Sequence, residues 1–201
     1  MLFEMERAGF CVSVDGLTDY GRKLEELENS LKERIYFYAG CEFNVNSPKQ
    51  LGEVLFEKMM LPAGKKTKSG YSTNADVLES LKYAHPAVSL LLEYRHLQKL
   101  KSTYCEGLIK EVSVDGRIHS TFNQTETRTG RISSTEPNLQ NIPVRSEEGR
   151  QFRRFFVAKD GYVLCDADYS QIELRVLAHM ANDQNMISAF KSGTDIHTLT
   201  A

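Results

Sequence analysis

Two aspartates stand immediately before a helical pattern in the stretch DADYSQIELRVLAH, residues 166 to 179. The run GYVLCDA before it alternates as a strand does, so Leu164, Asp166 and Asp168 share one face and Asp168 emerges at the strand's end. An exposed carboxylate at a rigid strand end suits Mg²⁺, which takes oxygen ligands and binds through one or two carboxylates plus substrate phosphate. The pattern indicates metal-assisted phosphate chemistry.

The same stretch also has a purely structural interpretation. Aspartate and serine are common where a strand turns into a helix, and Ser170 with Glu173 fits the capping box S-x-x-E. From this pattern alone, helix capping is the stronger interpretation, and a metal site needs support from other parts of the chain.

A long polar segment precedes the aspartates. Residues 125 to 149 show almost no periodicity, and loops of this length inside a compact region tend to be functional. The segment TRTGRISSTEPNLQNIP offers hydrogen-bond donors with little apolar sequence between them, namely Arg128, Arg131, Asn138, Gln140 and Asn141.

The net charge of −2 conceals a segregation of charge along the chain. Residues 49 to 70 carry five Lys against two Glu, and residues 117 to 159 carry eight Lys or Arg against four Glu. Residues 1 to 48 and 160 to 201 are each net acidic by four. Clustered positive charge favours a polyanionic partner such as nucleic acid, although such clusters are also typical of solvated faces.

Length and composition indicate a soluble globular protein of one or two domains. The chain has 201 residues, of which 41% are hydrophobic and 26% charged, and its apolar runs are far shorter than a membrane span. The N-terminus is acidic and lacks the pattern of a secretory signal, so we expect a cytoplasmic protein. The four cysteines form no C-x-x-C pair, which predicts reduced thiols without zinc or disulfides.

The first half of the chain predicts helices. Leu24, Leu27, Leu31, Ile35 and Tyr38 recur at helical spacing over residues 18 to 39, and a glycine follows as a stop. A second helix is expected from a cap at Ser47, with Pro48 at its first position and Gln50 completing a capping box. Further helices are expected over residues 74 to 83 and from Pro86 onward, where Leu91, Leu92, Leu97, Leu100, Tyr104 and Leu108 mark the apolar face.

The second half predicts a mixture of strands and helices. RIHSTFNQ alternates as a strand, FRRFFVA and GYVLCDA are expected to be two further strands, and SQIELRVLAHMAND is expected to be a helix. Its buried stripe is predicted to comprise Ile172, Val176, Leu177 and Met180. GTDIHTLTA indicates a further helix starting after a glycine, with Asp195 as its cap. The predicted fold class is α+β, a helical unit followed by a partial antiparallel sheet with helices.

These motifs resemble those of the family A DNA polymerases. DYSQIELRVLAH, with TGRISSTEPNLQNIPVR upstream and DIHTLTA downstream, carries the resemblance, which covers nearly the whole chain. EFNVNSPKQLGEVLFEK and LLEYRHLQKLKSTY resemble that family's thumb, and residues 117 to 191 resemble part of its palm. The resemblance implies a lead-in at the palm edge over 1–16, a thumb over 17–110, a partial palm over 111–191 and the start of the fingers over 192–201.

The resemblance implies roles at the aspartate motif. Asp168 matches the aspartate that binds two catalytic Mg²⁺ ions, with the Tyr169 carbonyl as an accessory ligand. Glu173 matches the steric gate that rejects a ribose 2′-hydroxyl and selects deoxynucleotides. Gln171 and Ile172 match positions lining the dNTP site, although Ile172 is also expected to be largely core.

The resemblance also implies contacts with template-primer duplex DNA. Arg128 lies in the same polar loop as Arg131, Asn138, Gln140 and Asn141, the last four of which match positions near the primer end that reach partly into the minor groove, where acceptors are nearly the same for every pair. Arg95 and Lys99 match positions facing DNA, although a lone Arg or Lys on a helix is ordinarily exposed to solvent. Positions where the thumb grips phosphates are Asn44, Asn46, Ser47, Lys49, Lys65, Lys66 and Lys68.

The sequence lacks parts that the family pattern requires. The fingers helix with its triphosphate-binding Arg and Lys is absent, and so is the second metal-binding aspartate, which predicts that these residues alone do not polymerise. The predicted function is therefore that of a fragment of a DNA-directed DNA polymerase, acting as a monomer without membrane contact. The alternatives are a non-catalytic nucleic-acid-binding module, and a metal-dependent phosphohydrolase that uses Asp166 and Asp168.

Overall fold

The computed structural model describes residues 1–62, 66–67 and 70–193, the pair 66–67 by its backbone alone. The chain divides into two compact units, a first unit of Met1–Gly161 and a second unit of Tyr162–Ala201. The helix expected after Gly193 lies outside the described residues. Within the described ranges, none of the helices combines the length and apolar character that crossing a membrane requires.

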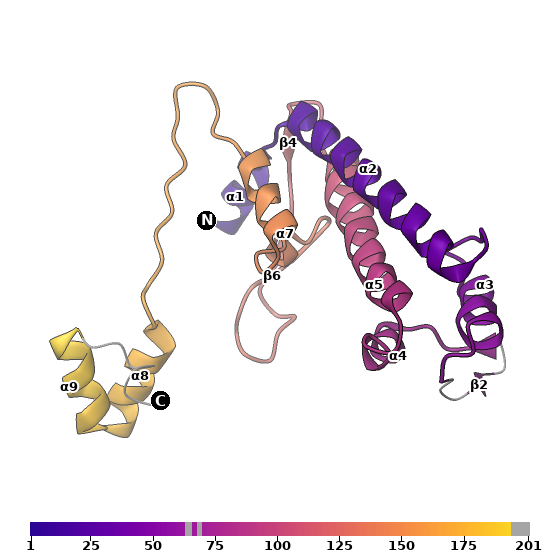
Figure 1. The fold of residues 1–201 in the computed structure, drawn as a ribbon. Helices are drawn as coiled ribbons and strands as arrows, with labels where there is room; N and C mark the ends of the chain where they lie inside the picture. The colour runs from indigo at the N-terminus through magenta and orange to yellow at the C-terminus, as the bar shows by residue number, and fades with distance from the viewer. Residues whose placement is uncertain (63–65, 68–69, 194–201) are drawn as a thin grey trace. The chain divides into compact units, whose positions relative to one another are not determined.

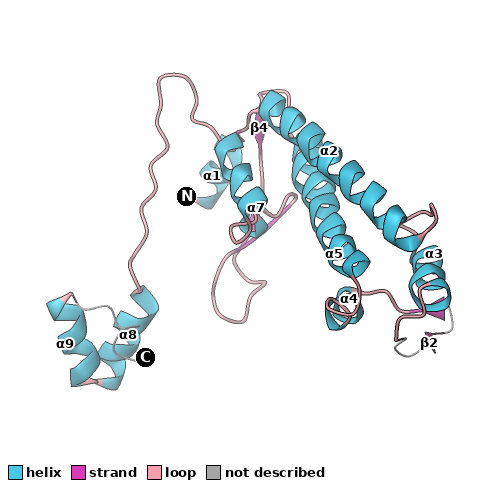
Figure 2. Ribbon diagram, viewed as in Figure 1, coloured by secondary structure: helices cyan, strands magenta, loops and turns pink. Residues whose placement is uncertain are grey.

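Helices dominate the first unit, with short antiparallel strand pairs between them (Figures 1 and 2). In chain order the elements are α1 Leu2–Ala8, β1 Phe10–Cys11, α2 Val14–Ala39, α3 Pro48–Glu53, the π-helical η1 Val54–Lys58, β2 Lys66–Thr67, β3 Gly70–Tyr71, α4 Ala75–Ser80, α5 Pro86–Lys99, the π-helical η2 Leu100–Glu106, α6 Gly107–Lys110, β4 Arg117–Ile118, β5 Thr121–Asn123, β6 Ser133–Thr135, the 3₁₀ turn η3 Leu139–Asn141, α7 Glu147–Gln151 and the 3₁₀ turn η4 Phe152–Phe155. The α+β fold class is confirmed.

The long helix α2 is built as its sequence predicts at both ends. Ser13 Oγ accepts a hydrogen bond from the Gly16 amide at 3.2 Å, which satisfies one of the free amides of the first turn. Gly40 ends the helix at φ 65°, a left-handed conformation that favours glycine. The helix therefore begins four residues before the expected position and stops where expected.

The buried face of α2 differs in part from the apolar positions named in the sequence. Its buried residues recur at alternating spacings of four and three, and they are Leu17, Gly21, Leu24, Glu28, Leu31 and Ile35. Leu27 and Tyr38, which share the helical apolar spacing, are exposed, so that spacing did not identify the buried face correctly at these two positions. A helix packed along one straight neighbour buries a narrow stripe, and Leu27 lies beside that stripe.

That neighbour is α5, which lies alongside α2 as the second arm of a helical hairpin (Figure 1). Val88, Leu91 and Leu97 are buried on α5, and the helical path continues through η2 and α6. Gly21 faces Cys105 of η2, where a Cβ would lie in ordinary van der Waals contact, 3.4 Å from Cys105 Cβ. Burying each large aliphatic side chain stabilises such a core by roughly 1.5–3 kcal/mol.

The start of α3 confirms Ser47 as the cap and Pro48 as the first helical residue. The expected capping box is only half formed. Ser47 Oγ accepts from the Gln50 amide at 3.4 Å, but Gln50 Oε1 accepts from the Asn44 amide at 2.7 Å and not from the amide of the cap residue. The amide of Ser47 is instead bonded to the carbonyl of Asn44.

The predicted strand RIHSTFNQ forms as two short strands. β4 pairs with β1, and β5 pairs with β6, both antiparallel. Ile118 and Ser120 are buried as the alternation predicts. His119 lies between β4 and β5, where the chain leaves one partner strand for another.

The two further strands expected at 152–158 and 161–167 do not form. Phe152–Phe155 is a 3₁₀ turn, Phe156 makes an isolated bridge with Val12, and residues 161–170 are exposed without regular structure. A strand is stable only when another strand satisfies its backbone groups, and among the described residues none pairs with 161–167. Asp168 therefore does not stand at the end of a strand, contrary to the prediction.

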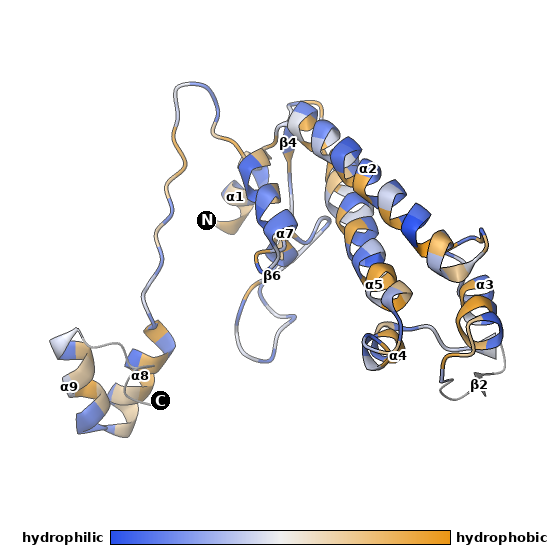
Figure 3. Cartoon of the chain, viewed as in Figure 1, coloured by the Kyte–Doolittle hydropathy of each residue, from blue (hydrophilic) through white to orange (hydrophobic). Residues whose placement is uncertain are grey.

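The second unit contains two helices, α8 Ile172–Ala181 and α9 Gln184–Ser192. Asp183 caps α9 by accepting from the amides of Asn185 and Met186 at 3.0 Å each. Both helices show apolar and polar residues in Figure 3. The stripe predicted as buried on α8 is exposed at all four positions, Ile172, Val176, Leu177 and Met180, and Ala178 is buried instead.

Candidate nucleic-acid interface and metal-binding segment

The turn before α3 is fixed by its own polar groups. Asn44 Oδ1 accepts from the Asn46 amide at 3.0 Å, in addition to the contacts with Ser47 and Gln50 described above. Asn46 Nδ2 donates to Tyr94 Oη on α5 at 3.3 Å, which ties the turn to the helical hairpin. Three of the residues predicted to grip phosphate, Asn44, Asn46 and Ser47, are thus held in one hydrogen-bonded turn.

An open pocket of about 400 Å³ lies beside this turn. Both asparagines line it, together with a lysine of α2 whose ammonium lies 5.6 Å from the centre of the Tyr36 ring. The lining residues are Lys32, Tyr36, Glu42, Phe43, Asn44, Val45, Asn46 and Tyr94. The amide donors and Lys32 suit a phosphate backbone, whereas the carboxylate of Glu42 opposes it.

The lysines predicted to bind DNA are described to different extents. Lys49 is exposed on the first turn of α3, and Lys99 is exposed on the last turn of α5. Lys65, Lys68 and the side chain of Lys66 lie outside the described residues. Lys49 and Lys99 are therefore accessible to a polyanion, as a phosphate contact requires.

Arg95 is fastened within the protein. Its guanidinium donates to the carbonyl oxygen of Thr73 and, at 3.4 Å, to the Thr73 hydroxyl. The side chain is half-buried, and desolvation lowers the pKa of its guanidinium. Arg95 therefore connects α5 to the segment before α4, and the interpretation of this residue as a freely solvated side chain was wrong. Its contact with DNA remains a prediction.

The loop between β5 and β6 presents the two arginines predicted to contact the primer-template. Arg128 and Arg131 are both exposed. Thr127 Oγ1 donates to the carbonyl of Arg131 at 2.6 Å, which closes the loop across its tip. The strand pairing of Thr121–Asn123 with Ser133–Thr135 holds the base of the loop.

The three amide residues beyond β6 are held by backbone contacts. Asn138 Oδ1 accepts from the Gln140 amide at 3.0 Å, and Gln140 Nε2 donates to the carbonyl of Ile132 at 2.8 Å. The carbonyl of Asn141 accepts from Tyr104 Oη at 2.6 Å, which anchors the turn to η2. All three asparagine and glutamine side chains are exposed, so the polar loop is ordered and faces solvent.

A buried serine pair, which the sequence analysis missed, organises this loop. Ser120 Oγ lies 2.6 Å from Ser134 Oγ and donates to the carbonyl of Pro137 at 2.8 Å. Ser134 Oγ also accepts from the Leu139 amide at 3.1 Å. The position of Ser120 on the inward side of the strand alternation was the one available signal, and a buried hydroxyl there requires a partner.

In the second unit the aspartate motif is open to solvent. Asp166, Asp168 and Tyr169 are all exposed. Asp168 is therefore not sealed in apolar packing, and its carboxylate is accessible to a cation. Among the described residues, no three His, Cys, Asp or Glu side chains are grouped so that they could hold one ion.

These donors fit part of a magnesium site but not a complete one. A carboxylate and a neighbouring carbonyl are oxygen ligands of the kind that Mg²⁺ prefers. A two-ion centre needs several carboxylate ligands, and the described residues gather no group of three or more His, Cys, Asp or Glu side chains that includes Asp168. Asp168 and the Tyr169 carbonyl can contribute to such a centre, and further ligands are required.

The residues that follow Tyr169 make a sharp turn into α8. Gln171 stands at the N-cap position with φ 54°, a left-handed conformation that is unusual for a residue with a side chain. Arg175 Nε donates to the Ser170 carbonyl at 2.9 Å, and its guanidinium carbon lies 4.5 Å from the centre of the Phe190 ring on α9. The capping box of Ser170 with Glu173 was a wrong prediction, because Gln171 occupies the cap.

The predicted nucleotide-binding residues begin α8. Ile172 and Glu173 are both exposed, as side chains that meet a substrate must be. The exposure of Ile172 shows that its expected core role was wrong for the second unit as described.

The comparisons with known proteins establish the family. A family model described as DNA polymerase family A matches residues 14–201, so the chain belongs to the family A DNA polymerases. DNA polymerase I of Lactococcus lactis subsp. lactis is 55% identical over 201 residues, and that of Geobacillus stearothermophilus is 56% identical over 203 residues. Each match covers 100% of this chain, but the chain spans only 23% of the length of these relatives.

A solved structure shows the same fold. It is described as the POL domain of Pol1 from M. smegmatis in complex with DNA primer-template and dNTP. The TM-score is 0.80 at 47% sequence identity, and the match covers 98% of this chain and 35% of that one.

Proposed function

We propose that this chain forms the thumb, over residues 17–110, and the first part of the palm, over 111–191, of a template-directed DNA polymerase. The reaction is nucleotidyl transfer from a dNTP to a primer 3′-hydroxyl, in replication or repair of DNA. The match to the family A model along residues 14–201 carries the proposal. The exposed Asp168 carboxylate at the motif that resembles the family's metal site supports it. The polymerase works as a monomer in the cytoplasm.

The aspartate motif supplies the chemistry of the proposed reaction. Asp168 and the Tyr169 carbonyl hold Mg²⁺, which when bound activates the primer hydroxyl and neutralises phosphate charge. Glu173 blocks a ribose 2′-hydroxyl, while Gln171 and Ile172 line the nucleotide. Asp168 and the first residues of α8 are separated by only a few positions, and the left-handed Gln171 turns the chain between them. This closeness in sequence supports the proposal that one nucleotide meets both.

The first unit supplies the grip on template-primer duplex. The turn of Asn44, Asn46 and Ser47 contacts phosphates, as do the lysines of the thumb. The exposed loop from Arg128 to Asn141 reads the end of the primer in the minor groove. Its donors test the geometry of a base pair without preferring a sequence, which is what a copying enzyme requires.

The proposal is tested in a chimera of the Geobacillus stearothermophilus polymerase whose matching 203 residues are replaced by this chain. We expect the chimera to extend a primer with Mg²⁺, and Asp168→Asn to lower kcat by about 10³-fold, since a lost metal ligand removes several kcal/mol of transition-state stabilisation. The matched control is Asp166→Asn, two residues earlier and also exposed, which should change kcat by no more than about threefold.

Two outcomes would count against the proposal. Phosphoester cleavage by the unaltered chain without any partner, lost equally in the Asp166 and Asp168 variants, would indicate a metal-dependent phosphohydrolase. A chimera that folds by circular dichroism and binds duplex DNA, but extends no primer, would indicate a non-catalytic nucleic-acid-binding module. The 201-residue chain alone should extend no primer, because its described residues hold no complete ion site.

A further inference from the structure

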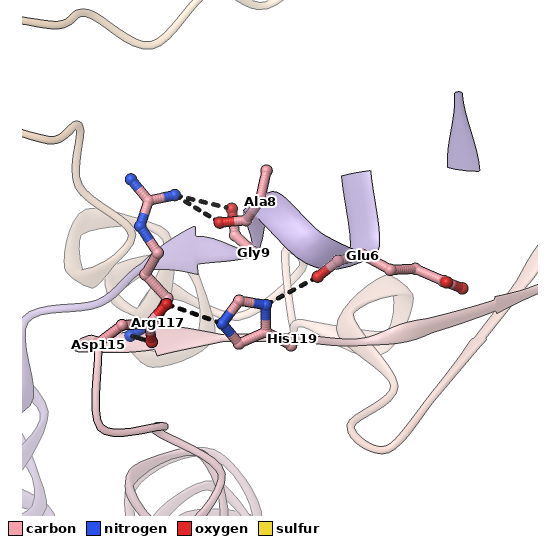
Figure 4. A network of polar contacts seen from close by, with 6 residues as sticks. All are labelled: Glu6, Ala8, Gly9, Asp115, Arg117 and His119. Carbon is pink, nitrogen blue, oxygen red and sulfur yellow. Dashed lines mark hydrogen bonds and ion pairs between the residues drawn. The ribbon is translucent and has the colours of Figure 1, made fainter. Parts of the chain in front are cut away.

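His119 lies between two groups that only accept hydrogen bonds. Its Nδ1 is 2.7 Å from the carbonyl oxygen of Glu6 in α1, and its Nε2 is 3.1 Å from Oδ2 of Asp115, in the turn before β4 (Figure 4). A neutral imidazole carries a proton on one nitrogen only, so it can satisfy one of these acceptors and presents a lone pair to the other. Only the imidazolium form donates to both.

The charges around the ring favour that form. The hydrogen bond to the Glu6 carbonyl, followed by those with the Asp115 carboxylate, raises the pKa of His119 against the opposing effects of desolvation and of the Arg117 charge. Desolvation acts to raise the pKa of Asp115, but the hydrogen bonds from His119 and from the Arg117 amide outweigh it and leave that pKa below its usual value. The carboxylate of Glu6 points away from the ring (Figure 4).

The contact between His119 and the Glu6 carbonyl fastens α1 to the segment that joins β4 and β5. Arg117 Nη1 donates to the carbonyls of Ala8, the last residue of α1, and of Gly9 at 2.7 and 3.3 Å, so a cationic side chain binds the end of this helix beside His119. The ring packs directly against Gly9, where a Cβ would lie 2.7 Å from His119 ring atoms. Gly9 also has φ 59°, so this close approach depends on glycine.

The same helix, α1, also contacts the base of the β5–β6 loop. Glu6 Oε1 accepts from the Phe122 amide in β5 at 2.7 Å. β5 pairs with β6, and the loop that joins them carries Arg128 and Arg131. A shift of α1 that broke the His119 contact would therefore move the residue that anchors β5.

We propose that doubly protonated His119 is a positioning residue for DNA binding, which fastens α1 and, through Glu6 and Phe122, holds the β5–β6 loop in its DNA-contacting position. When His119 loses a proton, it can donate to only one of its two acceptors, so this latch between α1 and the β4–β5 segment weakens and the affinity of the loop for duplex DNA falls. This inference rests on the proposed function of Arg128 and Arg131 as DNA contacts. The contribution of a histidine whose folded pKa is raised is complete below about pH 6.5 and disappears as pH rises through the folded value.

The proton state is measured first on the unaltered 201-residue chain by ¹⁵N NMR of the imidazole. We expect His119 to carry protons on both nitrogens at about pH 6.5 and to titrate above that value. His179, which is exposed on α8, provides the reference signal. A His119 that is a single neutral tautomer at about pH 6 would overturn the inference without any variant having to fold.

DNA affinity is then measured at constant salt at about pH 6 and about pH 8.5, where lysines and arginines keep their charge. The unaltered chain should bind a primer-template duplex about fivefold more weakly at the higher pH, a typical coupling between linked sites. His119→Gln should bind weakly at both pH values, and His179→Gln should retain the full pH dependence.

Different results would refute the His119 latch and the proposed DNA contacts. Equal affinity of the unaltered chain at both pH values would refute the latch and leave the DNA-binding function standing. Absence of DNA binding at either pH would refute the DNA contacts themselves and the latch with them.

Discussion

Glu28 is the one charged residue that the structure buries among the described residues, and it stands on the core stripe of α2 at 9% exposure. Its Oε1 has no hydrogen-bond partner within the described part of the chain. Lys101 on η2 is close by, but its ammonium is shared with Glu25 at 3.2 Å and Glu106 at 3.8 Å. Burial raises the pKa of Glu28, Lys101 opposes this, and the other two glutamates add to it.

This arrangement predicts that the Glu28 charge destabilises the helical hairpin at neutral pH. A carboxyl whose folded pKa is raised binds more protons in the folded state, so stability falls as pH rises from about 4.5 through the folded value. Glu28→Gln should therefore raise the free energy of unfolding by about 1 kcal/mol at pH 7 and change it little at about pH 4. Urea titrations at both pH values measure the difference.

Glu33→Gln serves as the control, because Glu33 is exposed on the same helix. It should change the free energy of unfolding by less than about 0.5 kcal/mol. A loss of stability in Glu28→Gln at pH 7 would contradict the inference that the Glu28 charge destabilises the hairpin. The carboxylate would then be a net favourable partner of Lys101.

At the level of elements, the polar loop is shaped by two serines from different strands. Ser134→Ala removes the oxygen that accepts from the Leu139 amide and that faces Ser120, so buried polar groups lose their partners. We expect a loss of about 1–3 kcal/mol in the free energy of unfolding. Ser133 is the matched control, since its buried Oγ has no partner among the described residues, and Ser133→Ala should cost almost nothing. Equal effects would refute the role of the pair.

Helix ends could be predicted from sequence because their determinants are local. Ser47, Pro48 and Gly40 act on backbone groups within a few residues, and each stands where the pattern placed it. The strands expected at 152–158 and 161–167 could not be predicted by alternation, because alternation reports which face a side chain takes and not whether a partner strand is present.

The candidate site shows the same division. The exposure of the loop arginines followed from the polar, aperiodic segment around them, whereas the exposure of Asp168 was predicted from the end of a strand that does not form. The serine pair and the His119 contacts join residues that are distant in sequence, at separations of 14 for Ser120 with Ser134 and 113 for His119 with Glu6. No local pattern encodes such a pairing, so only the fold could reveal it.

At the level of the whole molecule, the distribution of charge along the first unit decides whether it can bind a polyanion. The net charge of −2 would disfavour DNA if it were evenly spread. The eight Lys and Arg against four Glu over residues 117–159 concentrate positive charge at the predicted contact region. Phosphate contacts release counterions, so the logarithm of the binding constant should fall linearly with the logarithm of salt concentration.

The slope of this salt dependence reports how many cationic side chains lie against the DNA, so variants that change the slope identify those side chains. Replacing Arg128 and Arg131 together by Gln should reduce the slope's magnitude by about 2, close to one unit for each cation removed from the DNA surface, because a cation held in the minor groove also displaces counterions. Arg22→Gln removes a cation of α2 that is exposed and paired with Asp19 at 2.8 Å, and it should leave the slope unchanged. Fluorescence anisotropy with labelled duplex between about 50 and 200 mM salt measures both. An unchanged slope in the double variant would place the phosphate grip elsewhere, since affinity lost without a change in slope comes from contacts that release no counterions.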